Sequence, residues 1–261
     1  MWQSYVDAVI IVIVVAAGFW SIRRFPPPTT EITTPRTSSF NFLLIFRSLI
    51  VIANLVSLIG YSGLPRAFRY YTLWNFILQT IYYVLMLSYQ LRHRNESKEV
   101  PTDTEFRALN TLFDICISVS FLVCLVFWAV VHPTSPGQVI TLNLVYQHGI
   151  NCVLLLIELA FNGFVVRGST FGYTLLFPAL YGILSWIGHE TWLNGVWPYK
   201  FLDISSPASP GWYIGVVLVH PIFLWVAIQL SKLKRRFRPQ FCPRSHEEAL
   251  ASVITPKDSV V

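Results

Sequence analysis

Long apolar stretches constrain this chain more than any other feature of its sequence. A helix needs about 20 apolar residues to cross the hydrocarbon core of a bilayer, and several segments reach or approach that length. They cover residues 5–22, 40–61, 68–91, 109–131, 143–166, 171–187 and 212–230. The sequence therefore predicts an all-α fold, a polytopic transmembrane helix bundle of about seven spans.

The composition supports the same interpretation. Of the 261 residues, 54% are hydrophobic and 12% are charged, whereas about a quarter of the residues of a soluble domain are charged. This balance excludes an ordinary soluble enzyme, a disordered chain and a disulfide scaffold. We expect an integral multi-pass protein of the plasma membrane or of an endomembrane, two compartments that the sequence does not distinguish.

The chain divides into four predicted segments. Residues 1–22 form an N-terminal membrane anchor, because Arg23 and Arg24 follow its apolar run and no signal-peptide cleavage site does. Residues 23–39 form a linker rich in Pro, Thr and Ser, and residues 40–230 form a six-span transmembrane core. Residues 231–261 form a cytosolic tail that is first basic and then disordered.

Basic residues predict how the bundle is oriented. If the N-terminus lies outside, only Arg66, Arg69 and Lys200 of the 19 Lys and Arg residues fall in outer loops, and Arg47 falls within the second span. The others lie on the cytosolic side, as the positive-inside rule requires. The sequence thus predicts that the N-terminus is out and the C-terminus is in. It also predicts that the glycosylation sequon at Asn95 lies in the cytosol and carries no glycan.

The cysteines and the C-terminal tail give further expectations. Three cysteines lie within spans and are expected to be small buried hydrophobes: Cys116, Cys124 and Cys152. Cys242 follows the basic run 232–238, so a palmitoylated cysteine and a free thiol both stay open. The basic run suits an anionic leaflet or a stop-transfer signal. The segment Ser259-Val260-Val261 resembles a ligand of PDZ domains.

Ionisable residues within spans are costly and are therefore candidates for function. They are Asp7, Arg47, Asp114, His148, Glu158 and His220. Uncharged polar residues extend the set into two stripes at helical spacing. Thr72, Asn75 and Gln79 share one face of the third predicted span. His148, Asn151 and Glu158 share one face of the fifth. We expect both stripes to face the interior of the bundle.

Residue counting from the outer end of each span places Thr72 and His148 at a similar depth. A hydroxyl beside an imidazole is the minimum for nucleophilic catalysis, in which a third polar group orients the base. The candidate catalytic set is therefore Thr72 as nucleophile, His148 as base, and Asn75 or Asn151 as the orienting or oxyanion-binding group. Two alternatives stay open: these side chains join helices through hydrogen bonds, or they line a ligand or ion pathway.

No motif predicts a metal or a cofactor. The sequence contains no His-x-x-x-His or Cys-x-x-Cys spacing, no phosphate-binding loop and no Gly-x-Ser-x-Gly elbow. It also lacks the Asp-Arg-Tyr and Asn-Pro-x-x-Tyr motifs of G-protein-coupled receptors. We expect membrane lipids as partners, with no nucleic acid, metal or cofactor.

Four segments resemble the rolling stone-like family of membrane proteins. In chain order they are Tyr71-Thr72-Leu73-Trp74-Asn75-Phe76-Ile77-Leu78, Phe127-Trp128, Gln147-His148-Gly149-Ile150-Asn151-Cys152-Val153 and Trp197-Pro198-Tyr199-Lys200-Phe201-Leu202-Asp203. The similarity covers roughly residues 41–230. It implies a multi-pass bundle and a part in myoblast fusion, with no settled enzymatic role. The same framework is similar, more distantly, to the androgen-induced protein family and to the androgen-dependent TFPI-regulating proteins.

The more distant resemblance implies a chemistry. Androgen-induced proteins are threonine hydrolases of fatty acid esters of hydroxy fatty acids, with an intramembrane Thr and His. The Thr matches Thr72, whereas the catalytic His falls at Asn151, and His148 matches another histidine one turn earlier. An amide has no useful basicity, so hydrolysis needs His148 as the base. Two functions follow: a rolling stone-like membrane protein without certain enzymatic activity, and an intramembrane hydrolase of lipid esters.

Overall fold

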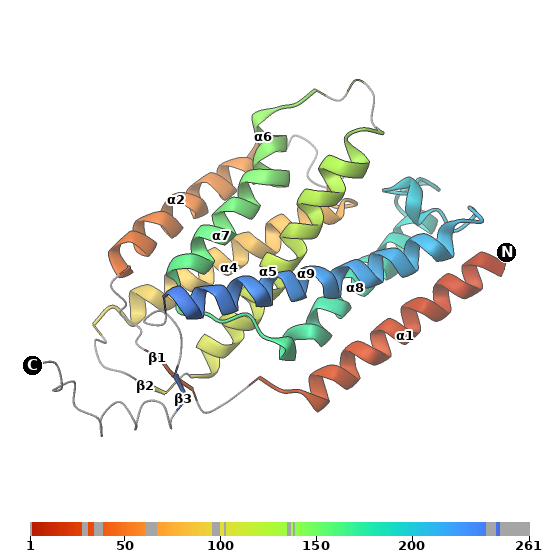
Figure 1. Cartoon of the computed structure of the whole chain (residues 1–261). Coiled ribbons are helices and arrows are strands. Elements are labelled where there is room, and N and C mark those ends of the chain that lie inside the picture. Colours follow the sequence, from red (N-terminus) through yellow and green to blue (C-terminus); the bar gives the residue numbers. More distant parts are fainter. Residues whose placement is uncertain are drawn as a thin grey trace, which may run out of the picture.

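The computed structural model is a bundle of long helices (Figure 1). It describes residues 2–27, 31–33, 39–60, 67–95, 100–101, 103–134, 137, 139–238 and 244–245. Within these residues, six helices are long and apolar enough to cross a membrane: Trp2–Arg24, Phe40–Ile59, Thr104–Val131, Leu142–Phe161, Gly168–Glu190 and Ser209–Phe237. Their length and composition suggest an integral multi-pass membrane protein.

The six helices correspond to named elements of the fold. They are α1 (Trp2–Arg24), α2 (Phe40–Ile59), α5 (Thr104–Val126) with the π-helical turn η1 (Phe127–Val131), α6 (Leu142–Val145) with the π-helical turn η2 (Tyr146–Ile150) and α7 (Asn151–Phe161), η3 (Gly168–Thr170) with α8 (Phe171–Glu190), and α9 (Ser209–Phe237). A short 3-10 turn, η4 (Lys200–Leu202), lies between α8 and α9. Each of the six covers most of one predicted apolar stretch.

A seventh long helix, α4 (Tyr71–Arg92), occupies the place of the third predicted span. It is long enough to cross a membrane, but its sequence mixes apolar residues with Asn, Gln and several Tyr. It is therefore not among the six helices that are also apolar enough. It packs between α2 and α5, and side chains such as Phe76, Tyr82 and Tyr83 are buried. The polar composition of α4 therefore belongs to a helix that faces protein on most sides.

Two of the predicted segments contain regular structure that the sequence did not predict. Helix α9 continues past residue 230 through the basic run and ends at Phe237, which agrees with the good helix propensity of Lys and Arg. The predicted linker contains strand β1 (Glu31–Thr33), which pairs antiparallel with β2 (Val100–Pro101) and β3 (Arg244–Ser245). We call the end of the bundle that carries this small sheet the sheet end (Figure 1).

Helix α1 packs closely against α8 through two glycines. A Cβ atom at Gly172 would lie 2.5 Å from the carbonyl oxygen of Gly18, and one at Gly18 would lie 2.8 Å from Leu176. Small residues at helix crossings let the two backbones approach each other in a membrane. The N-terminal helix is therefore part of the packed bundle and contributes to its walls.

The two π-helical turns lie side by side at the end opposite the sheet. The indole Nε1 of Trp128, in η1, donates a hydrogen bond to the carbonyl oxygen of His148, in η2, at 3.1 Å. A π-helical turn accommodates an extra residue in the helix, which turns the side chains that follow it. Such turns are frequent at functional sites.

Candidate functional site

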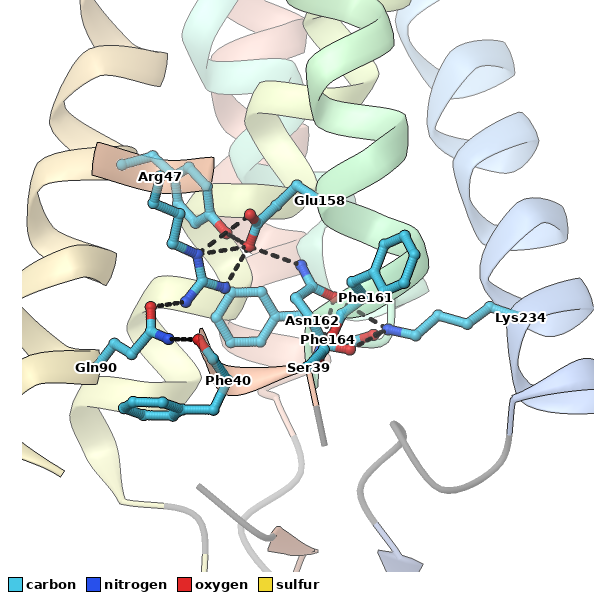
Figure 2. Close-up of polar contacts among 10 residues, drawn as sticks. Ser39, Phe40, Arg47, Gln90, Glu158, Phe161, Asn162, Phe164 and Lys234 are labelled. Carbon is cyan, nitrogen blue, oxygen red and sulfur yellow. Dashed lines mark hydrogen bonds and ion pairs between the residues drawn. The ribbon is translucent and has the colours of Figure 1, made fainter. Parts of the chain in front are cut away.

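The ionisable residues of the spans separate into two groups, and the first is satisfied by hydrogen bonds (Figure 2). Arg47 of α2 and Glu158 of α7 form a buried ion pair, in which Arg47 Nε lies 3.1 Å from both carboxylate oxygens. Arg47 Nη1 donates to Gln90 Oε1 at 2.8 Å. The Tyr82 hydroxyl donates to Glu158 Oε1 at 2.9 Å. The pair thus connects α2, α4 and α7 at one point.

Lys234 of α9 extends this arrangement (Figure 2). Its Nζ donates to the carbonyl oxygen of Asn162 at 2.7 Å, to Asn162 Oδ1 at 3.0 Å and to the carbonyl oxygen of Phe164 at 2.8 Å. Asn162 Nδ2 in turn lies 3.4 Å from Glu158 Oε1. A cation at the C-terminus of α7 is also favoured by the helix dipole. We call Arg47, Tyr82, Gln90, Glu158, Asn162 and Lys234 the sheet-end network.

Asp114 and Asp7 have structural partners too. Asp114 Oδ1 accepts from Asn110 Nδ2 at 2.9 Å, and its Oδ2 accepts from the backbone N–H of Arg167 at 3.2 Å. Asp7 Oδ2 accepts from Ser209 Oγ at 2.6 Å, which ties α1 to the start of α9. These contacts fix segments of the bundle to one another.

The second group of polar residues lines a cavity at the end opposite the sheet, which we call the cavity end. The cavity has a volume of about 800 Å³, and small-molecule sites usually occupy roughly 300–1,000 Å³. Its walls come from α1, the first turn of α4, the end of α5 with η1, α6 with η2, α8, residues 198–202 and the first half of α9. The described residues that line it include no Asp, Glu, Lys or Arg.

His148 lies on the cavity wall with one ring nitrogen fixed. Its Nδ1 is 2.9 Å from the carbonyl oxygen of Leu144, so Nδ1 carries the hydrogen and Nε2 holds the lone pair. The ring stacks on Phe127, with 3.6 Å between the ring centroids. Nε2 makes no hydrogen bond to any described residue. The geometry therefore presents the basic nitrogen of His148 without a partner.

Thr72 lies on the same cavity, in the first turn of α4. Its side chain lies near the hydroxyl of Tyr199, which accepts a hydrogen bond from the backbone N–H of Tyr71 at 3.1 Å. Burial raises the pKa of Tyr199 to about 12, so this phenol is neutral at physiological pH. In the described part of the chain no hydrogen bond joins Thr72 to His148. The cavity thus contains both predicted catalytic side chains, with Tyr199 beside Thr72.

A hydroxyl–imidazole pair does exist in the cavity, between two other residues. The hydroxyl of Tyr71 lies 3.0 Å from His220 Nε2, and both side chains line the cavity. In the sequence His220 is an ionisable residue within a span, and no partner for it can be predicted. Its partner lies 149 positions away in the sequence and directly precedes Thr72, so helical spacing alone gave no signal for the pair.

Asn75 and Asn151 lie one helical turn below the cavity and are not among the residues that line it. Asn151 Nδ2 donates to the carbonyl oxygen of Gln147, in its own helix, at 2.7 Å. Its Oδ1 and both amide atoms of Asn75 are buried without a hydrogen-bond partner in the described structure, and the same is true of Gln79 Nε2 and Ser120 Oγ. Beneath the cavity there is thus a layer of polar atoms that are not satisfied by protein.

The remaining predictions concern metal ligands, the cysteines, the sequon and the C-terminal segment. Over the described ranges, no three His, Cys, Asp or Glu side chains come together as a metal site. Cys116 and Cys152 are buried, Cys124 is half-buried, and all three are free thiols. Cys242, the segment 259–261 and residues 96 and 97 of the sequon lie outside the described residues.

Comparison with models of protein families, with curated proteins and with solved structures finds no match to this chain. The cavity and the side chains that surround it are therefore the features that point to a function.

Proposed function

We propose that this protein is a multi-pass membrane protein that holds a lipid-like amphiphile in its cavity. The cavity itself carries the proposal, because it combines about 800 Å³ of space and mostly apolar walls with a few polar side chains. Small-molecule sites have this composition, in which apolar walls provide contact area and a few polar groups fix the orientation. An amphiphile with one polar group and an acyl chain would match both parts.

We further propose seven spans, with α4 as the seventh, and an outer N-terminus. Basic residues at the sheet end support this orientation: Arg23, Arg24, Arg92, Arg235 and Arg236 lie in the last turns of α1, α4 and α9. By the positive-inside rule this end faces the cytosol, and the cavity opens toward the outer leaflet.

Glycosylation tests the orientation directly. The substitution Val196→Thr completes a sequon at Asn194, in the segment that connects α8 and α9, and this sequon should receive a glycan in cells. The natural sequon at Asn95 should stay bare. A glycan on Asn95 together with a bare Asn194 would reverse the proposed topology.

The rolling stone-like resemblance supports a function without catalysis, such as the organisation of membrane contacts, with residues 244–261 as a partner-binding tail. Deletion of this tail removes strand β3 and none of the described helices. It should abolish a cell-fusion phenotype while the protein still reaches the membrane. If the truncated protein supported fusion as well as the full chain, the proposed partner-binding role of the tail would be wrong.

Ligand retention tests the cavity. Native mass spectrometry of the full chain, purified in mild detergent, should show one co-purified lipid. Gly182 of α8 lines the cavity, and a Cβ there would meet only Ile11 at 3.9 Å, so Gly182→Phe should fill the cavity and exclude the lipid. Gly211→Phe, at an exposed position of α9 with no atom near its Cβ, is the matched control. Equal retention by both variants would refute the cavity as the binding site.

A second candidate function is an intramembrane hydrolase of lipid esters. The observation that favours it is the unpartnered Nε2 of His148 on the same cavity as Thr72. Thr72 Oγ1 would attack the ester carbonyl carbon while its proton passes to His148 Nε2. The bond from that carbon to the alcohol oxygen would then break, and the alcohol would leave with the proton from His148. A water molecule, activated by the same nitrogen, would release the acid from Thr72.

Turnover of a lipid ester by the full chain in proteoliposomes tests this candidate. Thr72→Ala and His148→Gln should each lower the rate, the latter by roughly 10²–10⁴-fold, which is typical of a general base. Thr111→Ala removes a threonine hydroxyl that is bonded to the carbonyl of Arg107 and lies away from the cavity, so it should retain the wild-type rate. Full activity of Thr72→Ala would reject the hydrolase.

A further inference from the structure

The Tyr71–His220 pair is a fixed polar group in an otherwise apolar part of the cavity. His220 is 2% exposed and Tyr71 is 7% exposed. His220 Nδ1 lies 2.7 Å from the carbonyl oxygen of Val216, so it carries the hydrogen, and Nε2 accepts from the Tyr71 hydroxyl at 3.0 Å. The phenol oxygen of Tyr71 therefore keeps its lone pairs available.

The surroundings hold Tyr71 in place. Its ring centroid is 4.9 Å from that of Tyr181 and 5.4 Å from that of Phe177. Its backbone N–H donates to Tyr199. A side chain fixed on several sides loses little conformational freedom when a ligand binds, which makes the site preorganised.

The charge of the lining limits what this site can accept. Burial of an ionised group away from water is costly unless an opposite charge and hydrogen bonds compensate it. Among the described lining residues there is no Lys or Arg to pair with a carboxylate or phosphate, and no Asp or Glu to pair with an ammonium. The cavity thus disfavours fatty acids, phospholipids and cationic amphiphiles.

We infer that the ligand of the cavity is an uncharged amphiphile, a lipid alcohol or ester, and that the Tyr71–His220 pair binds its polar group. This inference rests on the proposed lipid-binding function and specifies its ligand class. A ligand hydroxyl donates to the Tyr71 oxygen while Tyr71 donates to His220. For an ester carbonyl, the Tyr71 hydroxyl turns away from His220 and donates to the ligand instead.

Photo-crosslinking with two matched probes tests the ligand class. The full chain in nanodiscs is labelled at pH 8.5 with a diazirine analogue of monooleoylglycerol or of oleic acid, and the labelled peptides are identified by mass spectrometry. The neutral probe should label cavity-lining peptides of α4, α8 and α9, and excess monooleoylglycerol should suppress the label. Equal or stronger labelling of these peptides by the acid probe would overturn the inference while leaving the lipid-binding proposal intact. If neither probe labelled them, the proposed function itself would fail.

Single-atom variants test the role of the pair. Tyr71→Phe removes the hydroxyl that faces His220 and should weaken competition by monooleoylglycerol about 3–10-fold, the value of one net hydrogen bond. Tyr83→Phe is the matched control, because it removes the hydroxyl of another buried tyrosine of α4, one that makes no hydrogen bond in the described structure and does not line the cavity. Each variant is compared with wild type by its thermal unfolding profile. If monooleoylglycerol competed equally well in folded Tyr71→Phe and Tyr83→Phe, the Tyr71–His220 pair would have no part in ligand recognition.

Discussion

The candidate functional residues at the two ends of the bundle differ in their hydrogen bonds. At the sheet end, Arg47, Glu158 and Lys234 are buried with hydrogen bonds to several helices. At the cavity end, the basic nitrogen of His148 has no partner in the described chain, and the layer that contains Asn75 and Asn151 includes unsatisfied atoms. Buried polar groups in folded proteins are usually hydrogen-bonded. The difference indicates that the sheet end stabilises the fold and the cavity end is available for a ligand.

The largest expected effect concerns the sheet-end network. Glu158→Gln leaves Arg47 buried without its counter-charge and should lower the free energy of unfolding by about 3–5 kcal/mol. The double variant Arg47→Leu/Glu158→Leu removes both charges, so its free energy of unfolding should be much closer to that of the wild type. Chemical or thermal unfolding in detergent, followed by tryptophan fluorescence, compares the two. If the double variant were as unstable as Glu158→Gln, the loss of stability would not come from the uncompensated charge of Arg47.

A smaller loss is expected at Lys234. Lys234→Met removes three hydrogen bonds to the segment after α7 and should cost about 2 kcal/mol, in the range for hydrogen bonds to a charged group. Lys232→Met, at an exposed position two residues earlier in α9, changes charge equally and should cost almost nothing. The same unfolding measurement applies. Equal effects of the two variants would mean that net charge, and not the contacts with Asn162 and Phe164, sets the stability of α9.

The sequence predicted most of the helices because the length of an apolar run is a local property. The Arg47–Glu158 pair could not be predicted, since its members are 111 positions apart and each stood in a separate span. The same is true of Tyr71 and His220. Residue counting from the span ends placed Thr72 and His148 at one level, and both line the cavity. It could not predict that Tyr199, from the segment after α8, lies beside Thr72.

The smallest effect is expected beneath the cavity, and it has the opposite sign. Asn75→Leu replaces two unsatisfied amide atoms with an apolar side chain of similar size and should raise the free energy of unfolding by about 1 kcal/mol. A gain of stability with loss of lipid retention would sharpen the contrast between the two ends. A loss of more than 1 kcal/mol would instead place Asn75 with the stabilising groups, because its amide would then have partners such as ordered water.

The measurement that tests the account most directly is a cryo-electron microscopy map of the full chain in lipid nanodiscs, bound to an antibody fragment that provides mass. The account predicts continuous elongated density inside the cavity, with its polar end in hydrogen-bond contact with the Tyr71 hydroxyl, and no such density near Arg47 and Glu158. A cavity closed by side chains, or one that contains only separate water-sized peaks, would contradict it.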